Sequence, residues 1–379
     1  MKLKLHTFLP VLLLVTATVS AADRPVPAPP IIGAKSYLVI DGQTGHELAS
    51  LNPDERLAPA SLTKLMAAYA IFSALKEEQI RLDDEVTVSE NAWRTPGSRM
   101  FIEVGTRLSV EELLLGMIVQ SGNDASVALA EHVAGTEAVF AEVMNRYAAA
   151  LGMTASNFRN STGLPAENHY STARDLAILA RGIIREFPDF YRWYSVREYT
   201  YNEISQNNRN SLLWRDDSVD GMKTGHTDDA GYCLVSSAER DGMRIISVVL
   251  GTASAKSRID GSQALLNYGF RFYETRLLYR AGEEIATARI WKSANETTSL
   301  GVPQDLYVTV PRGSYDDLKS VLNIPAVLQA PVAEGQPLAE LQVSLNDKLL
   351  VTEPLRALQA NPVGTLWQRT TDSVSLWFE

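Results

Sequence analysis

The sequence predicts an α/β domain with a largely antiparallel sheet, followed by a small all-β domain. Within residues 31–285, strand patterns occur at both ends and helical patterns lie between them, an order typical of helices packed on such a sheet. After residue 285 the helical periodicity disappears, and short alternating runs such as LYVTVP and ELQVSLND are separated by Pro and Gly. A chain of 379 residues is long enough for two such domains.

The first 22 residues have the layout of a secretory signal peptide. Two lysines precede an apolar stretch from residue 8 to about residue 19, and three small residues follow at 20–22. The alternative is a membrane helix, but a span needs ~20 apolar residues and this stretch is shorter. We therefore predict export with cleavage after Ala22 or Ala21, and a Pro-rich linker over 23–30.

The predicted first domain, 31–285, begins with two strands within 35–59, joined by a turn at Asp41-Gly42. A mostly apolar helix over 60–75 is expected to be buried. Four further helices follow: 109–120, 123–135, 137–152 and 172–187. A hairpin and a helix close the domain: strands over 231–239 and 243–252 and a helix over 262–275.

Local sequence signals support these boundaries. Ser109 and Glu112 fit a capping box at the start of the helix over 109–120, and Gly135 and Gly152 end the next two helices. The hairpin turns at Arg240-Asp241-Gly242.

A small β domain over 286–360 is followed by an amphipathic segment, 361–379. Its apolar residues fall on one helical face: Val363, Leu366, Trp367, Thr370, Val374, Trp377 and Phe378. A stripe with Trp and Phe is typical of an interfacial membrane helix. The alternative is a C-terminal helix or strand packed on the β domain. Because the polar face has a single basic residue, Arg369, the residues alone leave both interpretations open.

Composition narrows the class of protein. The chain has 45 acidic and 35 basic residues, a net charge of −10, which argues against a nucleic-acid partner because phosphate binding relies on Lys and Arg. There is one cysteine, Cys233, so no internal disulfide can form. An exported chain without disulfides favours a bacterial envelope. Cys233 lies in the apolar run GYCLVSS, and we interpret it as a packed core residue.

Ser61 and Lys64 form a candidate nucleophile and base. On a helix, residues three apart share one face. In the first turn, free N–H groups and the helix dipole favour negative charge on the serine, and a neutral amine one turn away can take its proton. A second Ser-x-x-Lys, Ser73 to Lys76, lies in the middle of the same helix, where no dipole assists it, and we interpret it as structural.

Two further polar groups follow in the chain. Ser121 and Asn123 stand at a predicted helix N-terminus, where a loop can present both side chains to one cavity. Ser-x-Asn occurs several times in this sequence, so this pair indicates a site only because it lies between Ser-x-x-Lys and Lys-Thr-Gly in the chain. Lys-Thr-Gly occurs once, at 223–225; on an edge strand the lysine supplies positive charge, and the missing side chain of Gly225 lets a substrate backbone approach.

In this order, Ser-x-x-Lys, Ser-x-Asn and Lys-Thr-Gly resemble the three motifs of the penicillin-recognising serine enzymes. More closely, the chain resembles the low-molecular-mass penicillin-binding proteins that are D-alanyl-D-alanine carboxypeptidases. The resemblance covers nearly the whole mature chain: PASLTKLM, SGNDAS, NSTGLP, STARDLA, DGMKTGHTDDAGYCLV, GFRFYET, the β domain and the terminal helix. It implies an α/β penicillin-recognising fold, similar to β-lactamases and transpeptidases, with a small all-β C-terminal domain.

The resemblance also implies roles for individual residues. Ser61 would attack the carbonyl between the two terminal D-alanines of a peptidoglycan stem peptide, and Lys64 would be its base. The backbone N–H groups of Ser61 and His226 would form the oxyanion hole. Ser121 would relay a proton, with Lys223 holding its hydrogen bonds. Water would then hydrolyse the acyl-enzyme.

The remaining site residues are implied to bind the substrate. Asn123 would bind the substrate amide, and Thr224 and Arg258 would hold the terminal carboxylate. The strand with Gly225 would dock the C-terminal peptide. β-Lactams, which mimic this terminus, should acylate Ser61. The mechanism needs no metal or cofactor.

In this family the β domain is thought to raise the catalytic domain from the membrane, and the terminal helix to anchor it. The resemblance therefore favours the membrane interpretation of residues 361–379. It implies a peripheral protein on the periplasmic face of the bacterial inner membrane, with a role in cell-wall biosynthesis and remodelling.

Alternatives differ in the fate of the acyl group. A class A β-lactamase carries the same three motifs and also Glu-x-x-x-Asn, but Glu167 and Asn168 lack that spacing, and the extra β domain argues against this class. A transpeptidase, which replaces water by an amine, and an endopeptidase acting on cross-links remain open. A non-catalytic wall-binding protein would have a degenerate site, whereas all motif residues are present here.

Overall fold

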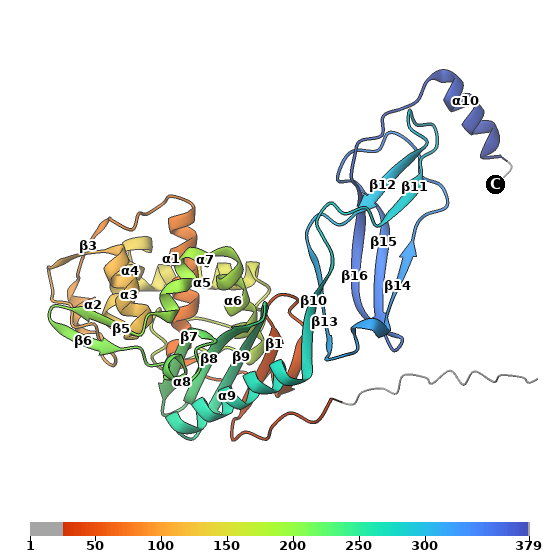
Figure 1. Cartoon of the computed structure of the whole chain (residues 1–379). Helices are drawn as coiled ribbons and strands as arrows, with labels where there is room; N and C mark the ends of the chain where they lie inside the picture. The colour runs from red at the N-terminus through yellow and green to blue at the C-terminus, as the bar shows by residue number, and fades with distance from the viewer. Residues whose placement is uncertain (1–25, 378–379) are drawn as a thin grey trace, which may run out of the picture.

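The computed structural model describes residues 26–377. The predicted signal peptide, 1–22, the first residues of the predicted linker and the last two residues of the predicted C-terminal segment lie outside the described residues. Figure 1 shows two domains side by side: a larger one with helices and a central sheet, and a smaller one built of strands.

The central sheet has five strands in the order β2-β1-β9-β8-β7, and all its neighbours are antiparallel. The strands are β1 (Ser36–Asp41), β2 (Glu47–Leu51), β7 (Val219–Thr227), β8 (Gly231–Arg240) and β9 (Met243–Thr252). The predicted hairpin is confirmed as β8–β9, where Asp241 and Gly242 both have positive φ, at 50° and 78°. Such two-residue turns match the twist of the strands. Strand β7 lies at an edge of the sheet.

The sheet has a separate hydrophobic core on each face, because alternate strand residues point to opposite sides. Leu38 and Val248 belong to the core shared with the helices between β2 and β7, whereas Val39 and Val249 pack with α9 (Ala255–Phe272). Helix α1 (Thr63–Lys76) is buried along nearly its whole length, as its apolar sequence predicts. It begins with a 3-10 turn, η1 (Ala60–Leu62), where a continuous helix from residue 60 is expected.

The four helices predicted between the strands are present, with ends within about two residues of their expected positions: α3 (Val110–Val119), α4 (Asn123–Ala134), α5 (Glu137–Ala150) and α6 (Ala173–Glu186). The capping box of Ser109 and Glu112 is formed. Shorter elements fill the loops: β3 (Glu85–Thr87), α2 (Glu90–Arg94), β4 (Arg107–Ser109), α7 (Pro188–Tyr191), η2 (Arg192–Ser195), β5 (Glu198–Tyr201), β6 (Ile204–Asn207) and α8 (Leu212–Arg215).

The closing helix differs from its prediction. Helix α9 begins at Ala255 instead of residue 262, because Ser254 caps it by accepting the backbone N–H of Ser257, and Ile259 in its first turns packs on the sheet. It ends at Phe272, and β10 (Tyr273–Tyr279) follows directly. Strand β10 pairs with β13 (Leu306–Pro311), so pairing crosses the boundary predicted at residue 285.

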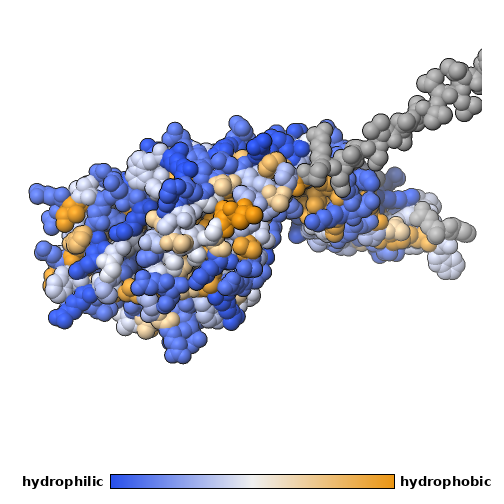
Figure 2. Space-filling view, turned by 90° about the horizontal axis from the view of Figure 1, so that it is seen from below, coloured by the Kyte–Doolittle hydropathy of each residue, from blue (hydrophilic) through white to orange (hydrophobic). Residues whose placement is uncertain are grey.

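The smaller domain is built on a five-stranded sheet in the order β11-β12-β16-β15-β14. Its strands are β11 (Ala286–Arg289), β12 (Thr297–Gly301), β14 (Leu318–Asn323), β15 (Pro337–Leu345) and β16 (Lys348–Ala357), with one 3-10 turn, η3 (Tyr315–Asp317). Its own hydrophobic core includes Leu300, Leu341 and Leu355. Hydrophilic residues cover most of the face of the molecule seen in Figure 2, as the high net charge leads us to expect.

Helix α10 (Leu366–Ser375) stands at the end of the β domain farthest from the larger domain (Figure 1). Its polar side faces the protein: Asp372 accepts the backbone N–H of Lys292. Its apolar side faces outward, with Trp367 77% exposed; Trp377, two residues beyond its end, is 90% exposed. Over the described range, no helix has both the length and the apolar character needed to cross a membrane.

Candidate active site

Ser61 lies in the η1 turn, directly before α1, and is partly exposed. The preceding residue, Ala60, has a φ of 48°, in the left-handed region that non-glycine residues rarely adopt. Lys64 follows in the first turn of α1, and its Nζ lies 3.2 Å from Ser61 Oγ. The three-residue spacing thus places the hydroxyl and the amine on one face.

The Lys64 side chain is buried, at 1% exposure, among polar partners. Its Nζ lies 2.6 Å from Asn123 Oδ1 and 2.7 Å from the carbonyl oxygen of Thr162. The pKa of Lys64 is lowered to about 7, mainly by burial; the Asp124 carboxylate opposes this shift and the positive charge of Arg209 contributes to it. A substantial fraction of Lys64 is therefore neutral at neutral pH.

The contact geometry suits a neutral amine, which has two N–H donors and one lone pair. The two short contacts, to the oxygens of Asn123 and Thr162, use both donors. The lone pair is then available to the more distant Ser61 Oγ. Proton abstraction requires the serine hydroxyl to donate to this lone pair, and the 3.2 Å separation is short enough for that.

Ser121 and Asn123 lie at the start of α4, and Asn123 contacts Lys64. Ser121 is 2% exposed and has a φ of 64°, the second left-handed non-glycine residue of the site. Within residues 26–377 its hydroxyl has no hydrogen-bond partner, and Lys223 Nζ instead donates to the Thr224 carbonyl, at 3.1 Å. The Asn123 amide group is occupied at both ends, since its Nδ2 donates to the Pro96 carbonyl at 2.6 Å.

Strand β7 brings Lys223 and Thr224 into the same region, and both side chains are buried. Burial lowers the pKa of Lys223 well below its usual value, and the nearby charges of Lys64, Arg209 and Arg258 act in the same direction. The site therefore gathers four basic side chains, two lysines and two arginines. A site lined by basic groups favours an anionic ligand.

Gly225 allows a close approach between two parts of the protein. A Cβ at this position would lie 2.9 Å from the Pro59 carbonyl oxygen and 3.2 Å from Ala60 Cβ. The bare backbone therefore allows β7 to pack against the turn that holds Ser61. The expectation that a substrate backbone docks along this strand stays a prediction.

Arg258 and His226 flank the same strand. Arg258, in the first turn of α9, is 8% exposed, and its Nη1 donates to the Gly225 carbonyl at 3.3 Å. Its Nε is buried and has no hydrogen-bond partner among residues 26–377. The His226 side chain is exposed, and its ring lies 4.0 Å from the ring of Tyr232.

Comparison with known proteins agrees with this arrangement. The family model described as D-alanyl-D-alanine carboxypeptidase matches residues 23–254. The chain belongs to the D-alanyl-D-alanine carboxypeptidase family. A second model, the C-terminal domain of penicillin-binding protein 5, matches residues 273–362 of this carboxypeptidase, beginning at β10. The catalytic class is that of a serine hydrolase acting in peptidoglycan metabolism.

Relatives resemble the carboxypeptidase over most of its length. The D-alanyl-D-alanine carboxypeptidase DacA of Escherichia coli is 41% identical, over 96% of this chain and 94% of its own. Penicillin-binding protein 5 from Haemophilus influenzae matches with a TM-score of 0.85 and 42% identity, over 89% of this chain and 99% of its own. Penicillin-binding protein D2 from Listeria monocytogenes, in its ampicillin-bound form, matches with a TM-score of 0.59 and 30% identity, over 64% of this chain and 100% of its own.

Several site residues of the carboxypeptidase were not predicted from the sequence. Thr162 contributes only its backbone carbonyl, which no side-chain motif reveals. Asp124 accepts the backbone N–H groups of Met100 and Phe101 at 2.8 and 2.9 Å, and so holds the loop that binds Asn123. In the sequence, Asp124 could have been noticed as a charged residue at the start of a largely apolar helix.

Other side chains match their structural interpretation. Ser73 of the second Ser-x-x-Lys donates to the Tyr69 carbonyl at 2.9 Å, inside α1. Cys233 is fully buried. His169 is buried too, and its Nε2 lies 2.8 Å from Thr63 Oγ1. Within the described part of the chain, no three His, Cys, Asp or Glu side chains are grouped closely enough to hold a metal ion.

Proposed function

We propose that Ser61 is the nucleophile and Lys64 the general base that release the terminal D-alanine from peptidoglycan stem peptides. The observation that carries this proposal is the 3.2 Å contact between Ser61 Oγ and Lys64 Nζ, made by an amine whose pKa is lowered to about 7. A neutral amine at this distance can take the hydroxyl proton as the oxygen attacks.

The reaction proceeds in two steps. Ser61 Oγ forms a bond to the carbonyl carbon between the two D-alanines while its proton passes to Lys64 Nζ. The backbone N–H groups of Ser61 and His226 stabilise the resulting oxyanion. The C–N bond then breaks, and Ser121 relays the proton from Lys64 to the leaving D-alanine amine. Water adds to the acyl carbon and gives a proton to Lys64, which passes it to Ser61 Oγ as the ester bond breaks.

The terminal carboxylate of the substrate binds between β7 and α9. Lys223, Thr224 and Arg258 form this carboxylate site. The buried Nε of Arg258, which has no hydrogen-bond partner among the described residues, supports it, because a buried unpaired donor is costly without a ligand. Asn123, whose amide group is held by Lys64 and Pro96, positions the base, and contact with the substrate amide requires it to exchange one of these partners.

β-Lactams acylate Ser61 in place of the peptide. They carry a carboxylate next to a reactive carbonyl, so the same cationic site orients them. The ampicillin-bound form of the Listeria relative, which matches 64% of this chain, supports this part of the proposal.

The protein is exported and associates with the periplasmic face of the inner membrane through α10. The exposed apolar side of this helix, including Leu366 and Trp367, supports an interfacial position. The polar side remains on the β domain through the contact of Asp372 with Lys292. The layout of the first 22 residues supports export.

Release of free D-alanine from a peptide ending in D-Ala-D-Ala tests this assignment. We expect Ser61→Ala to lower the rate by roughly a thousandfold or more, as loss of a serine nucleophile does in other hydrolases. Ser73→Ala is the matched control, because Ser73 belongs to the second Ser-x-x-Lys and should leave the rate within about twofold. D-Alanine release that persists in Ser61→Ala would remove Ser61 from the nucleophile role. Penicillin turnover without any D-alanine release would indicate a β-lactamase.

A further inference from the structure

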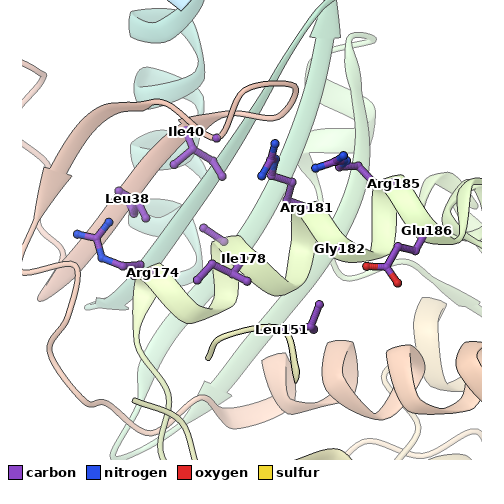
Figure 3. Close-up of a pocket in the computed structure, with 11 residues that line it drawn as sticks. Leu38, Ile40, Leu151, Arg174, Ile178, Arg181, Gly182, Arg185 and Glu186 are labelled. Atoms are coloured by element: carbon purple, nitrogen blue, oxygen red, sulfur yellow. The ribbon is translucent and has the colours of Figure 1, made fainter. Parts of the chain in front are cut away.

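A pocket of about 550 Å³ lies between α6 and β1, on the same face of the sheet as α1 but toward the edge opposite β7. It is lined by parts of α6, of β1 and its following turn, and by Leu151 (Figure 3). Strand β1 is separated from β7, the strand of the active site, by β9 and β8. The volume is within the range of small-ligand pockets, and nothing in the proposed reaction uses this space.

The pocket combines an apolar floor with a cationic rim. Leu38, Ile40 and Ile178 form the floor. Arg181 and Arg185 project from α6 beside it, and the Arg185 side chain points toward Arg181 in Figure 3. The two guanidinium groups are close enough that the charge of Arg185 lowers the pKa of Arg181, after the larger effect of burial.

No carboxylate neutralises this pair by direct contact within residues 26–377. Arg181 donates to the backbone carbonyls of Gly42 and Gln43, at 3.0 and 2.8 Å, which leaves its Nη1 without a hydrogen-bond partner there. Arg185 makes no side-chain hydrogen bond or ion pair with the same residues. Asp41 attracts Arg181 only at longer range, because its carboxylate already accepts from Thr44 and Thr275.

The other charged residues of the lining are occupied. Arg174 binds Asp54 and Glu47, at 2.7 and 3.0 Å. Glu186 accepts the hydroxyl of Tyr69 at 2.8 Å, and in Figure 3 its carboxylate points away from Arg181 and Arg185. Two adjacent arginines, of which Arg185 is exposed, have no counter-ion among residues 26–377 in a chain of net charge −10, an arrangement that suits an anion.

We propose that this pocket is a second peptide site, which binds the C-terminal carboxylate of a wall peptide at Arg181 and Arg185 and its terminal alanine methyl on the apolar floor. The choice of a peptide rests on the proposed function, because substrate and product of that reaction both end in a carboxylate next to a methyl group. A lipid headgroup is the less suitable anion, since α10 stands at the far end of the molecule (Figure 1). Such a site would hold the enzyme on the polymer while Ser61 acts on another stem.

Binding is tested on the full protein with Ser61 blocked by excess penicillin, so that only a site outside the active site can respond. The probe is N-acetyl-D-alanyl-D-alanine, titrated by calorimetry, and its C-terminal amide is the uncharged control. We expect binding of the carboxylate form, weakened about tenfold in Arg185→Gln and in the amide, because charge-assisted pairing is lost. Arg192→Gln, an exposed arginine outside the pocket, should bind as the unmodified protein does.

Several results would overturn the proposal: no binding to the blocked protein, equal binding of the amide, or full affinity in Arg185→Gln. Binding of phosphatidylglycerol vesicles that depends on Arg185, without peptide binding, would assign the pocket to a lipid instead. Failure of the proposed function is seen separately, as a protein that penicillin does not label. Arg185→Gln should release D-alanine from the short peptide at the unmodified rate, since the pocket is remote from Ser61.

Discussion

Lys64 is buried and yet surrounded by groups that hold it in one orientation. Desolvation destabilises its charged form, and the two carbonyl oxygens of Asn123 and Thr162 use the donors of its neutral form. The pKa of about 7 reflects a balance between burial, which lowers it, and the carboxylates of Asp124 and Glu137, which raise it. This balance makes the charge state of Lys64 sensitive to pH in the neutral range.

Acylation by penicillin should therefore depend on pH. The neutral amine is the active base, and its fraction rises as the pH passes upward through about 7, so the second-order acylation rate should increase from pH 6 to pH 8 and then level off. Stopped-flow measurement of acylation across this range is the test. A rate that falls over the same interval would contradict neutral Lys64 as the base.

Removal of the amine gives an independent prediction. Lys64→Ala should lower the acylation rate by at least about a hundredfold, as loss of a general base does, while the fold persists. Lys76→Ala is the matched control, because Lys76 ends α1 beside the ring of Phe187 and belongs to the second Ser-x-x-Lys. Normal acylation by Lys64→Ala, with circular dichroism unchanged, would remove Lys64 from the base role.

At the scale of elements, the site depends on how closely β7 approaches the η1 turn. The contact is made at Gly225, where the backbone of the strand meets Pro59 and Ala60. This spacing fixes the separation of Ser61 from the carboxylate-binding end of β7. This close contact thus brings β7 and the start of α1, which are distant in sequence, together in one site.

Gly225→Val should separate the two elements. Its Cβ alone would meet the Pro59 carbonyl oxygen at 2.9 Å, and backbone cannot move as a flexible side chain does. We expect acylation to slow by at least about a hundredfold, because displacements near 1 Å have effects of this size. Gly33→Ala, which has no atom within 4 Å of the added carbon, is the control. Acylation at the unmodified rate in Gly225→Val would show that this contact does not set the spacing.

At the scale of the whole molecule, a hydroxyl cluster joins the two domains. Asp41, at the end of β1, is fully buried and accepts Thr275 Oγ1 of β10 at 2.7 Å. Thr309 of β13 lies 2.6 Å from Thr44 Oγ1 and 2.9 Å from Thr275 Oγ1. These bonds fix the base of the β10–β13 ribbon on the catalytic sheet, and so set the direction of the β domain seen in Figure 1.

Thr275→Val should weaken this junction. It removes one donor from a buried carboxylate, at a cost of about 1–2 kcal/mol, which corresponds to a melting midpoint roughly 2–4 °C lower. Thr275→Ser, which keeps the hydroxyl, should retain most of the stability. Scanning calorimetry compares the two variants, and penicillin acylation should stay unchanged in both. An equal midpoint for valine and serine would mean that the hydroxyl does not stabilise the junction.

Much of the fold could be predicted because local sequence determines local structure. The helix over 109–120 has its capping box, and the β8–β9 turn has an Asp-Gly pair that accepts positive φ. Helix α9 was placed too late, since its first turns look polar in sequence and are recognised as helical only by Ile259 packing on the sheet. Strand β10 was missed for a related reason: its partner, β13, lies about thirty residues further on.

The sequence by itself determined which reactive groups are present and, through the helical spacing, that Ser61 and Lys64 share a face. It did not determine that Lys64 loses its charge so readily, because that depends on burial among Asn123, Thr162 and the surrounding core. Nor did it show that β7 packs against Pro59 at Gly225, or that Arg181 and Arg185 border a pocket and have no counter-ion in the described part of the chain. Only the tertiary structure decided these points, since pKa and close packing depend on neighbours that are distant in sequence.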